Sequence, residues 1–314
     1  MREARKKLLG QGCYYHLMNR VSGPVSGYYP FTDVDKEYGI KLLQKAAKFF
    51  LVEVISASWM GNHFHLVVYA PNEVPSAEKV AGRYNRFYGK SKYIDATEVE
   101  RCKQIGEQMI DISYFMKWYL QKYTCYFNRV HNHRGSLWAD RFKSTIVQGT
   151  EALWKCVKYV ELNPVRAGLT ENPADYRFST WGYFCGSGRP LFKKYFLRHM
   201  KRSRWGDKAS NYSEEDLYSE LRGELGRTIA NESGLAGKAL DEAIAKARKK
   251  ESMPVRFLRR TRHWTDGVVI GSKSFVQETY CQFRDKEEVM RHKLSRGSTE
   301  TGTLYCYRLL KKNV

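Results

Sequence analysis

The sequence predicts an α+β fold, with a ferredoxin-like antiparallel sheet followed by a mainly helical C-terminal extension. Three observations lead to this prediction. Strand-like and helical patterns follow one another in the order β-α-β-β-α-β-α, no internal repeat is present, and the composition becomes strongly basic from about residue 193. We therefore expect two parts: residues 1–190, with an insertion near 71–110, and residues 191–314, a basic linker with a helical region.

The elements of the first part follow from periodicity and turn residues. Aromatic and β-branched runs predict strands, the second and third joined as a hairpin, at residues 13–21, 51–59, 63–70 and 141–148. Apolar residues at helical spacing predict helices at residues 33–50, 112–129 and 150–162. The last helix should stop where Asn163 precedes Pro164, because a residue before proline disfavours the helical region. Residues 71–110 are polar and predict a loop with short helices.

The second part carries weaker signals. The basic stretch after residue 193 reads as a linker, and polar helical patterns follow at 213–225 and 235–250. Ser272 is a candidate N-cap for a helix within 269–283. This last element either contacts DNA as a second binding element or packs back on the core.

Charge and composition narrow the function. The chain has 314 residues, with 54 Lys and Arg against 33 Asp and Glu, a net charge of +21. This excess favours a polyanionic partner, and 22 Tyr, 15 Phe and 7 Trp suit stacking on single-stranded bases. No apolar run reaches about 18 residues, so we expect no membrane association. Seven cysteines without a C-x-x-C pair indicate a reducing cytoplasm and no cysteine zinc site.

Two groups of residues could carry chemistry. His63 and His65 share one face of a predicted strand, where two imidazoles can converge on one metal ion or simply face solvent. Tyr159 and Asn163 lie one helical turn apart, which places a hydroxyl nucleophile beside an amide ligand, although a helical Tyr is also a common core residue. A second H-x-H at His131 and His133 falls in a loop, so we expect a phosphate contact or a simple turn there.

Taken together, the motifs resemble a known family. The segments that carry the resemblance are W-M-G-N-H-F-H-L-V-V, Y-F-N-R, L-W-A-D-R-F-K-S, Y-V-E-L-N-P-V-R-A-G-L and D-Y-R-F-S-T-W, within residues 13–185. The chain is similar in these segments to the REP-associated tyrosine transposases of the single-tyrosine HUH superfamily. The long extension after Lys193 and the 71–110 insertion depart from its short members.

The resemblance implies a fold, a site and a partner. It implies an RRM-like HUH core in which His63 and His65 bind Mg²⁺ or Mn²⁺, with Asn163 in the place of the third ligand. Tyr159 would attack single-stranded or hairpin DNA and form a 5′-phosphotyrosine intermediate. The protein would be a bacterial, cytoplasmic, nucleoid-associated monomer or homodimer.

Basic side chains near these motifs are the DNA-binding candidates. They are Lys117, Lys122, Arg129, Arg134, Arg141, Lys143 and Arg166. Two competing functions stay open: a catalytically idle, domesticated member that only binds hairpin DNA, and an RRM-like RNA-binding protein. The aromatic strand signature of the RNA-binding domains is absent, which disfavours the latter.

Overall fold

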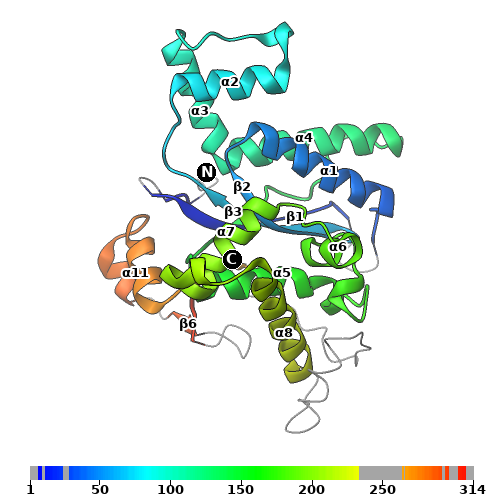
Figure 1. Ribbon diagram of the computed structural model, residues 1–314, viewed down its shortest axis with the longest axis vertical. Coiled ribbons are helices and arrows are strands. Elements are labelled where there is room, and N and C mark those ends of the chain that lie inside the picture. Colours follow the sequence, from blue (N-terminus) through cyan, green and yellow to red (C-terminus); the bar gives the residue numbers. More distant parts are fainter. Residues whose placement is uncertain are drawn as a thin grey trace.

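One mixed sheet lies between two layers of helices in the computed structural model (Figure 1). The structure describes residues 6–8, 11–23, 28–232, 264, 266–291, 294–296 and 303–308. The strands are β1 (Cys13–Arg20), β2 (Glu53–Trp59), β3 (His63–Ala70), β4 (Lys143–Val147), β5 (Gly267–Gly271), β6 (Ser295–Arg296) and β7 (Tyr305–Arg308). The α-helices are α1 (Asp33–Phe49), α2 (Ala77–Tyr88), α3 (Val99–Ile110), α4 (Ile112–Val130), α5 (Glu151–Arg166), α6 (Thr180–Ser187), α7 (Lys193–Trp205), α8 (Glu214–Glu232), α11 (Lys273–Cys281) and α12 (Lys286–Arg291).

The strand order of the sheet is β2-β3-β1-β4-β5-β7-β6. The first four strands pair with one another in antiparallel fashion, so the α+β class and the antiparallel core of the prediction are confirmed. β5 then pairs parallel to β4, and β7 and β6 continue the sheet. These three strands were not predicted from the sequence, because each is short and β5 pairs with a strand about 120 residues away.

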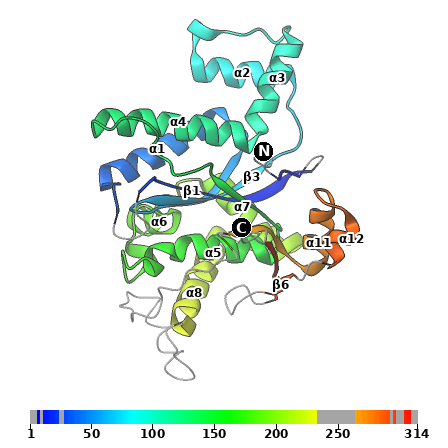
Figure 2. The ribbon, with the colours of Figure 1, turned by 180° about the vertical axis from the view of Figure 1, so that it is seen from behind.

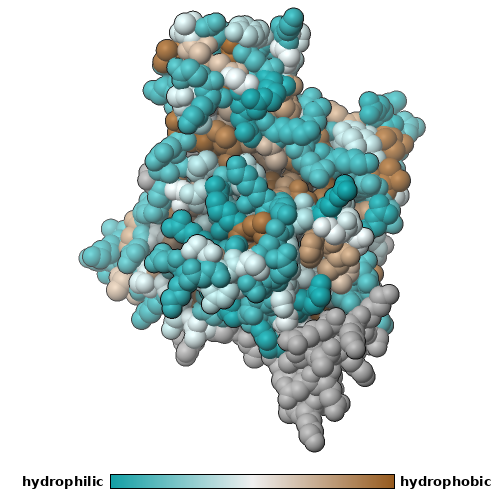
Figure 3. All heavy atoms as spheres, viewed as in Figure 1, coloured by the Kyte–Doolittle hydropathy of each residue, from teal (hydrophilic) through white to brown (hydrophobic). Residues whose placement is uncertain are grey.

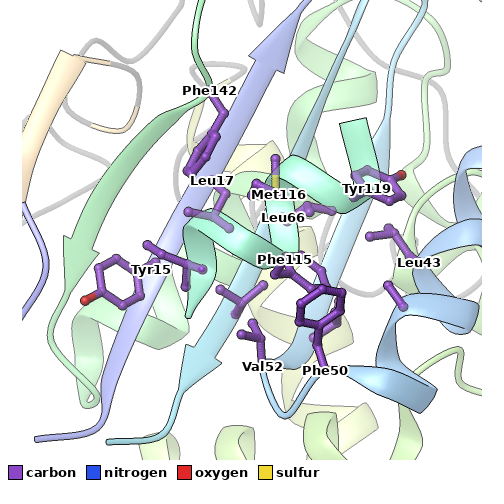
Figure 4. Packing of buried hydrophobic residues seen from close by; sticks show 14 of the residues in the cluster. Tyr15, Leu17, Leu43, Phe50, Val52, Leu66, Phe115, Met116, Tyr119 and Phe142 are labelled. Atoms are coloured by element: carbon purple, nitrogen blue, oxygen red, sulfur yellow. The ribbon is translucent and has the colours of Figure 1, made fainter. Parts of the chain in front are cut away.

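The two faces of the sheet bury different side chains. On one face, Leu17 of β1 and Leu66 of β3 pack against Phe115 and Met116 of α4 (Figure 4). On the other face, residues such as Val67 pack against α5. Successive side chains of a strand alternate between faces, so the α4 face of β1 and β3 is mostly apolar, whereas their α5 face carries histidines as well as apolar residues. Figures 1 and 2 show α1 and α4 on one side of the sheet and α5 on the other.

A buried carboxylate fixes the start of α1. Asp35 forms a capping box with Thr32, which satisfies backbone N–H groups of the first helical turn. Its Oδ1 also accepts hydrogen bonds from Tyr126 at 3.2 Å and from His131 Nε2 at 2.8 Å. Burial raises the pKa of Asp35, but the bonds from His131 and Thr32 outweigh it and lower the pKa overall. His131 of the second H-x-H therefore has a structural partner, and His133 bonds to Asn128.

Two boundaries differ from the sequence prediction. The helix expected to end at Asn163 continues through Pro164 as α5, to Arg166. Proline is tolerated there because it lies in the last turn, where few helical bonds remain to be lost. The segment expected as a basic linker forms helix α7, because Phe196, His199 and Met200 recur at helical spacing and are buried. The helix predicted at 235–250 lies outside the described residues.

The remaining helices extend the two layers. The 71–110 insertion contains α2 and α3, which project beyond the α4 side of the sheet (Figure 2). Arg83 anchors α2 by donating hydrogen bonds to carbonyls at the end of α1 and just after it. Ser272 is confirmed as the N-cap of α11, where it accepts from Phe275 N–H. No helix among the described residues has the length and apolar character needed to cross a lipid bilayer.

We predict that Asp35→Ala lowers the free energy of unfolding by about 3–5 kcal/mol, because it removes a buried carboxylate that accepts from Tyr126, His131 and Thr32. Asp33→Ala in the same helical turn is the control. Its side chain is 71% exposed, and its removal should cost less than about 1 kcal/mol. Urea denaturation measures both. Folding lowers the pKa of Asp35. The difference in free energy of unfolding between wild type and Asp35→Ala should therefore be largest at pH 7 and shrink in acid. Equal losses in the two variants would contradict this assignment.

Candidate functional site

β3 and α5 bring the predicted histidines and tyrosine together. His63 and His65 lie on the α5 face of β3 with ring centroids 5.1 Å apart and planes at 83°. The ring of Tyr159 meets His65 edge-on, with centroids 5.7 Å apart. Since β3 and α5 are about 90 residues apart in sequence, only the packing of α5 on this face creates the cluster. The sequence prediction that His63 and His65 share a face is confirmed.

Asn163 lies one turn after Tyr159 and is buried, with 7% of its surface exposed. Its Nδ2 has no hydrogen-bond partner within the described structure. A buried amide that lacks a partner is costly and is typical of a functional site. An acceptor such as a phosphate or water oxygen would satisfy this nitrogen, and the oxygen of the same amide is the atom that could ligate a metal ion.

A third imidazole, from β1, controls the protonation of His65. His16 Nδ1 lies 3.0 Å from the backbone carbonyl of Trp264, which can only accept, so this nitrogen carries a proton. Burial lowers the pKa of His16 to about 4, and the ring is neutral at pH 7. Its Nε2 is therefore an acceptor, and His65 Nδ1–H donates to it at 2.9 Å. The lone pair of His65 then lies on Nε2.

The tautomer of His63 follows from similar reasoning. Asn62 Nδ2 donates to the carbonyl of Tyr28 at 2.8 Å, which orients the amide. Asn62 Oδ1 is then the acceptor for His63 Nδ1–H at 2.7 Å. Both histidines of the pair thus carry their lone pairs on Nε2, the protonation state that metal ligation requires.

Arg166 is the predicted DNA-binding residue that the fold brings to Tyr159. It is buried, and its guanidinium carbon lies 5.0 Å from the centre of the Tyr159 ring. Its Nη1 donates to the Tyr159 backbone carbonyl at 3.2 Å. A cation over the ring face favours negative charge developing on the phenol.

Two further cations lie on the same face of the sheet. Arg20 pairs across the strands with His63, and Lys143 pairs with Met18, which in turn lies opposite His65. Cross-strand partners share a face, so Arg20 of β1 and Lys143 of β4 lie on the same face of the sheet as the two histidines. Lys143 also forms an exposed ion pair with Asp266 at 3.1 Å. Arg20 was missed from the sequence because its register could not be known.

The other DNA-binding candidates lie elsewhere. Lys117, Lys122 and Arg129 are exposed on α4, on the opposite side of the sheet from α5. Arg134 and Arg141 are exposed in the connection between α4 and β4. Arg166 and Lys143 therefore lie on the Tyr159 side of the sheet, whereas the cations of α4 form a separate surface. Figure 3 shows hydrophilic residues spread widely over the visible face of the molecule.

The site is closed on one side by Trp264. Its ring stacks on Tyr159 with centroids 5.7 Å apart and planes at 27°, and both side chains are buried. Tyr159 and His65 are 4% and 2% exposed, so any substrate reaches them only if the residues above them move. The sequence analysis missed Trp264 and His16. The signals were a histidine inside an otherwise apolar strand and a tryptophan within a basic segment.

A buried glutamate holds α5 against the sheet. Glu161, two residues after Tyr159, accepts a hydrogen bond from Ser56 Oγ at 2.7 Å and another from Trp181 N–H at 2.9 Å. These bonds connect α5 to β2 and to the start of α6. Burial raises the pKa of Glu161 to about 7 although both bonds favour the charged form. The position of the Tyr159 helix therefore depends on a polar contact within an apolar interface.

Within the described ranges, no three His, Cys, Asp or Glu side chains come together as a metal site. His16 is not a third ligand, because both of its ring nitrogens are hydrogen-bonded. A metal ion at this place would thus depend on His63, His65 and the amide of Asn163. That set of ligands leaves coordination positions for phosphate and water.

No protein-family model matches the chain, and no curated protein sequence does. Among solved structures, the chain is similar to a REP-associated tyrosine transposase bound to a REP hairpin. The two share 16% sequence identity, the match covers 61% of this chain and 90% of the other, and the TM-score is 0.38. The function therefore has to be argued from the site itself.

We predict that Ser56→Ala lowers the free energy of unfolding by about 1.5–3 kcal/mol, because it removes a buried hydrogen bond to Glu161. Ser58→Ala is the matched control: it is a buried serine of the same strand whose hydroxyl contacts only the sulfur of Met60, at 3.7 Å. Ser58→Ala should lower the free energy of unfolding clearly less than Ser56→Ala does. Chemical denaturation of both variants decides the matter, and a larger loss in Ser58→Ala would refute the role given to Glu161.

Proposed function

We propose that this protein is a single-stranded DNA endonuclease and strand transferase that acts on REP-type hairpin DNA through a 5′-phosphotyrosine at Tyr159. The observation that carries the proposal is the convergence of His63, His65 and Tyr159 from two remote elements. The resemblance of their sequence motifs to the REP-associated tyrosine transposases supports the same conclusion.

The site residues fit a divalent metal ion, Mg²⁺ or Mn²⁺. Both histidines carry their lone pairs on Nε2, and the buried side chain of Asn163, one turn after Tyr159, offers an amide oxygen as a third donor. We propose that His63, His65 and Asn163 hold the ion. When bound, it would withdraw charge from a non-bridging oxygen of the scissile phosphate. The protein's own contribution is to orient these ligands through His16 and Asn62.

The proposed reaction is an exchange of phosphate esters. The Tyr159 Oη–phosphorus bond forms while the bond from phosphorus to the 3′ oxygen breaks. The phenol loses its proton and the departing 3′ oxygen takes one up, so no nucleotide or redox cofactor is consumed. Arg166 lies over the Tyr159 ring and stabilises the charge that the phenol gains on the way. A free 3′ hydroxyl can reverse the step and rejoin the strand.

Charge supports DNA as the partner. The chain carries a net charge of +21. Around the site, the proposed phosphate contacts are Arg166 and Lys143, with Arg20 as an addition from the structure. The more distant candidates Lys117, Lys122, Arg129, Arg134 and Arg141 would contact a hairpin stem rather than the scissile phosphate.

We assign the first 190 residues to a ferredoxin-like HUH core. The strand order β2-β3-β1-β4, antiparallel throughout, supports this assignment. Residues 191–314 contribute α7, α8 and three strands to the same sheet and cores. We propose that the protein acts as a bacterial, cytoplasmic, nucleoid-associated monomer or homodimer.

A catalytically idle hairpin-binding protein is the second candidate. The burial of Tyr159 and His65 beneath Trp264 favours it, because the closed site does not admit DNA. An idle protein, however, has no need of two histidines in the ligating tautomer beside a tyrosine. The two candidates differ in one measurable product, a covalent protein–DNA adduct.

We predict that wild-type protein incubated with Mn²⁺ and a labelled single-stranded hairpin oligonucleotide forms an SDS-stable adduct, and that Tyr159→Phe forms none. The substitution removes one hydroxyl and keeps the ring, so hairpin affinity should stay within about threefold of wild type. Tyr114→Phe, at a tyrosine that is 47% exposed on α4, should retain the adduct. Mass spectrometry should place the linked nucleotide on Tyr159. Absence of any adduct with wild type would favour the idle binder, and a link at another residue would refute the assignment.

We predict that His63→Ala and His65→Ala reduce cleavage by about 10²-fold or more, because each removes one ligand of the ion that activates the phosphate. Hairpin binding should persist, since phosphate contacts need no metal. The control is His133→Ala in the second H-x-H, whose side chain bonds to Asn128. It should cleave like wild type. Gel assays of cleavage and fluorescence anisotropy of binding give both quantities, and normal cleavage by the two strand variants would contradict the prediction.

A further inference from the structure

His16 is the third imidazole on the site face, and the sequence motifs assign it no role. Only 1% of its surface is exposed, and its ring stacks on His65 with centroids 5.1 Å apart and planes at 7°. It also meets Tyr159 edge-on at 5.8 Å. With one nitrogen on the Trp264 carbonyl and the other on His65, its hydrogen-bonding capacity is used completely.

We infer that His16 is a positioning residue that holds His65 in the tautomer able to ligate metal, and that the backbone carbonyl of Trp264 holds His16 in turn. The inference rests on the proposed function. It follows from the direction of the donors: the carbonyl accepts from His16 Nδ1–H, so His16 Nε2 accepts from His65 Nδ1–H. His65 then presents Nε2 with its lone pair.

Such outer partners have a physical effect on a ligand. A hydrogen bond accepted from the far nitrogen of an imidazole fixes the orientation of the ring and increases the basicity of the ligating nitrogen. His63 has the same kind of support from Asn62, a single amide close to it in sequence. The chain of hydrogen bonds that supports His65 is longer, because it runs from β3 through His16 of β1 to the carbonyl of Trp264.

Through these hydrogen bonds the C-terminal part of the protein contributes a residue to the site. Trp264 belongs to the region after residue 191, to which the family resemblance assigned no role. It lies just before β5, which pairs with β4 on the far side of β1 from β3. The same residue that stacks on Tyr159 therefore also sets the tautomers of two histidines.

The test compares two substitutions of His16 in the full chain. His16→Phe keeps a stacked ring and removes both nitrogens, whereas His16→Gln keeps one donor and one acceptor in its amide. Isothermal titration with Mn²⁺ should show affinity weakened by about 10–100-fold in His16→Phe. In His16→Gln the affinity should stay within about fivefold of wild type. A folded His16→Phe with unchanged Mn²⁺ affinity would overturn the inference, because a purely structural residue would alter only thermal stability.

A second readout separates this inference from the proposed function. In protein labelled with ¹⁵N-histidine, the imidazole nitrogen shifts report which nitrogen of His65 carries the proton. We expect Nδ1–H in wild type and in His16→Gln, and a changed or mixed tautomer in His16→Phe. If wild type binds no Mn²⁺, the proposed metal chemistry fails, and the tautomer alone decides the role of His16. A His65 protonated at Nε2 in wild type would overturn the inference, whether or not His16→Phe folds.

Discussion

The register of β1 against β3 is the constraint on which the rest of the site depends. In that register Met18 lies opposite His65 and Arg20 lies opposite His63. Strand side chains alternate with a period of two, so a slip of one residue would turn the histidines into the apolar layer beneath α4. Phe64 and Leu66 prevent such a slip because they are fully buried in that layer. The apolar residues of β3 thus determine where its polar residues point.

α5 completes the site at a cost in desolvation. The helix lies between an apolar sheet face and other helices, yet it buries Glu161, Asn163 and Arg166. A buried polar group is tolerated when it is hydrogen-bonded, and two of the three have partners: Glu161 binds Ser56, and Arg166 binds the carbonyl of Tyr159. Asn163 keeps an unsatisfied nitrogen. The contacts of Glu161 therefore support the helix, whereas those of the Asn163 amide are incomplete among the described residues.

The C-terminal part belongs to the same folded unit. β5 pairs with β4, and α7 packs on the α5 side of the sheet, where His199 contacts Tyr14 at 2.9 Å and Glu53 at 2.6 Å. Trp264 then reaches the centre of the site through its ring and its carbonyl. These contacts explain why Tyr159 is buried in the structure. Substitutions in the C-terminal part that move Trp264 should therefore alter the hydrogen bonds of His16 and His65.

The sequence by itself determined the local features of this protein. Aromatic and β-branched runs predicted the first four strands, helical spacing predicted α1, α4 and α5, and alternation placed His63 and His65 on one face. These are properties of contiguous residues, so periodicity reveals them. The continuation of α5 through Pro164 was not predictable in this way, because tertiary packing overrides a local preference against helix at that position.

Only the tertiary structure decided which remote residues meet. The pairing of His16 with His65 and the stacking of Trp264 on Tyr159 each join segments far apart in the chain. Pairing of β5 with β4 likewise depends on a long crossover that no local pattern encodes. The sequence also could not show which of the basic DNA-binding candidates lie near Tyr159 and which lie on α4. The sheet separates them, because α4 and α5 cover opposite faces.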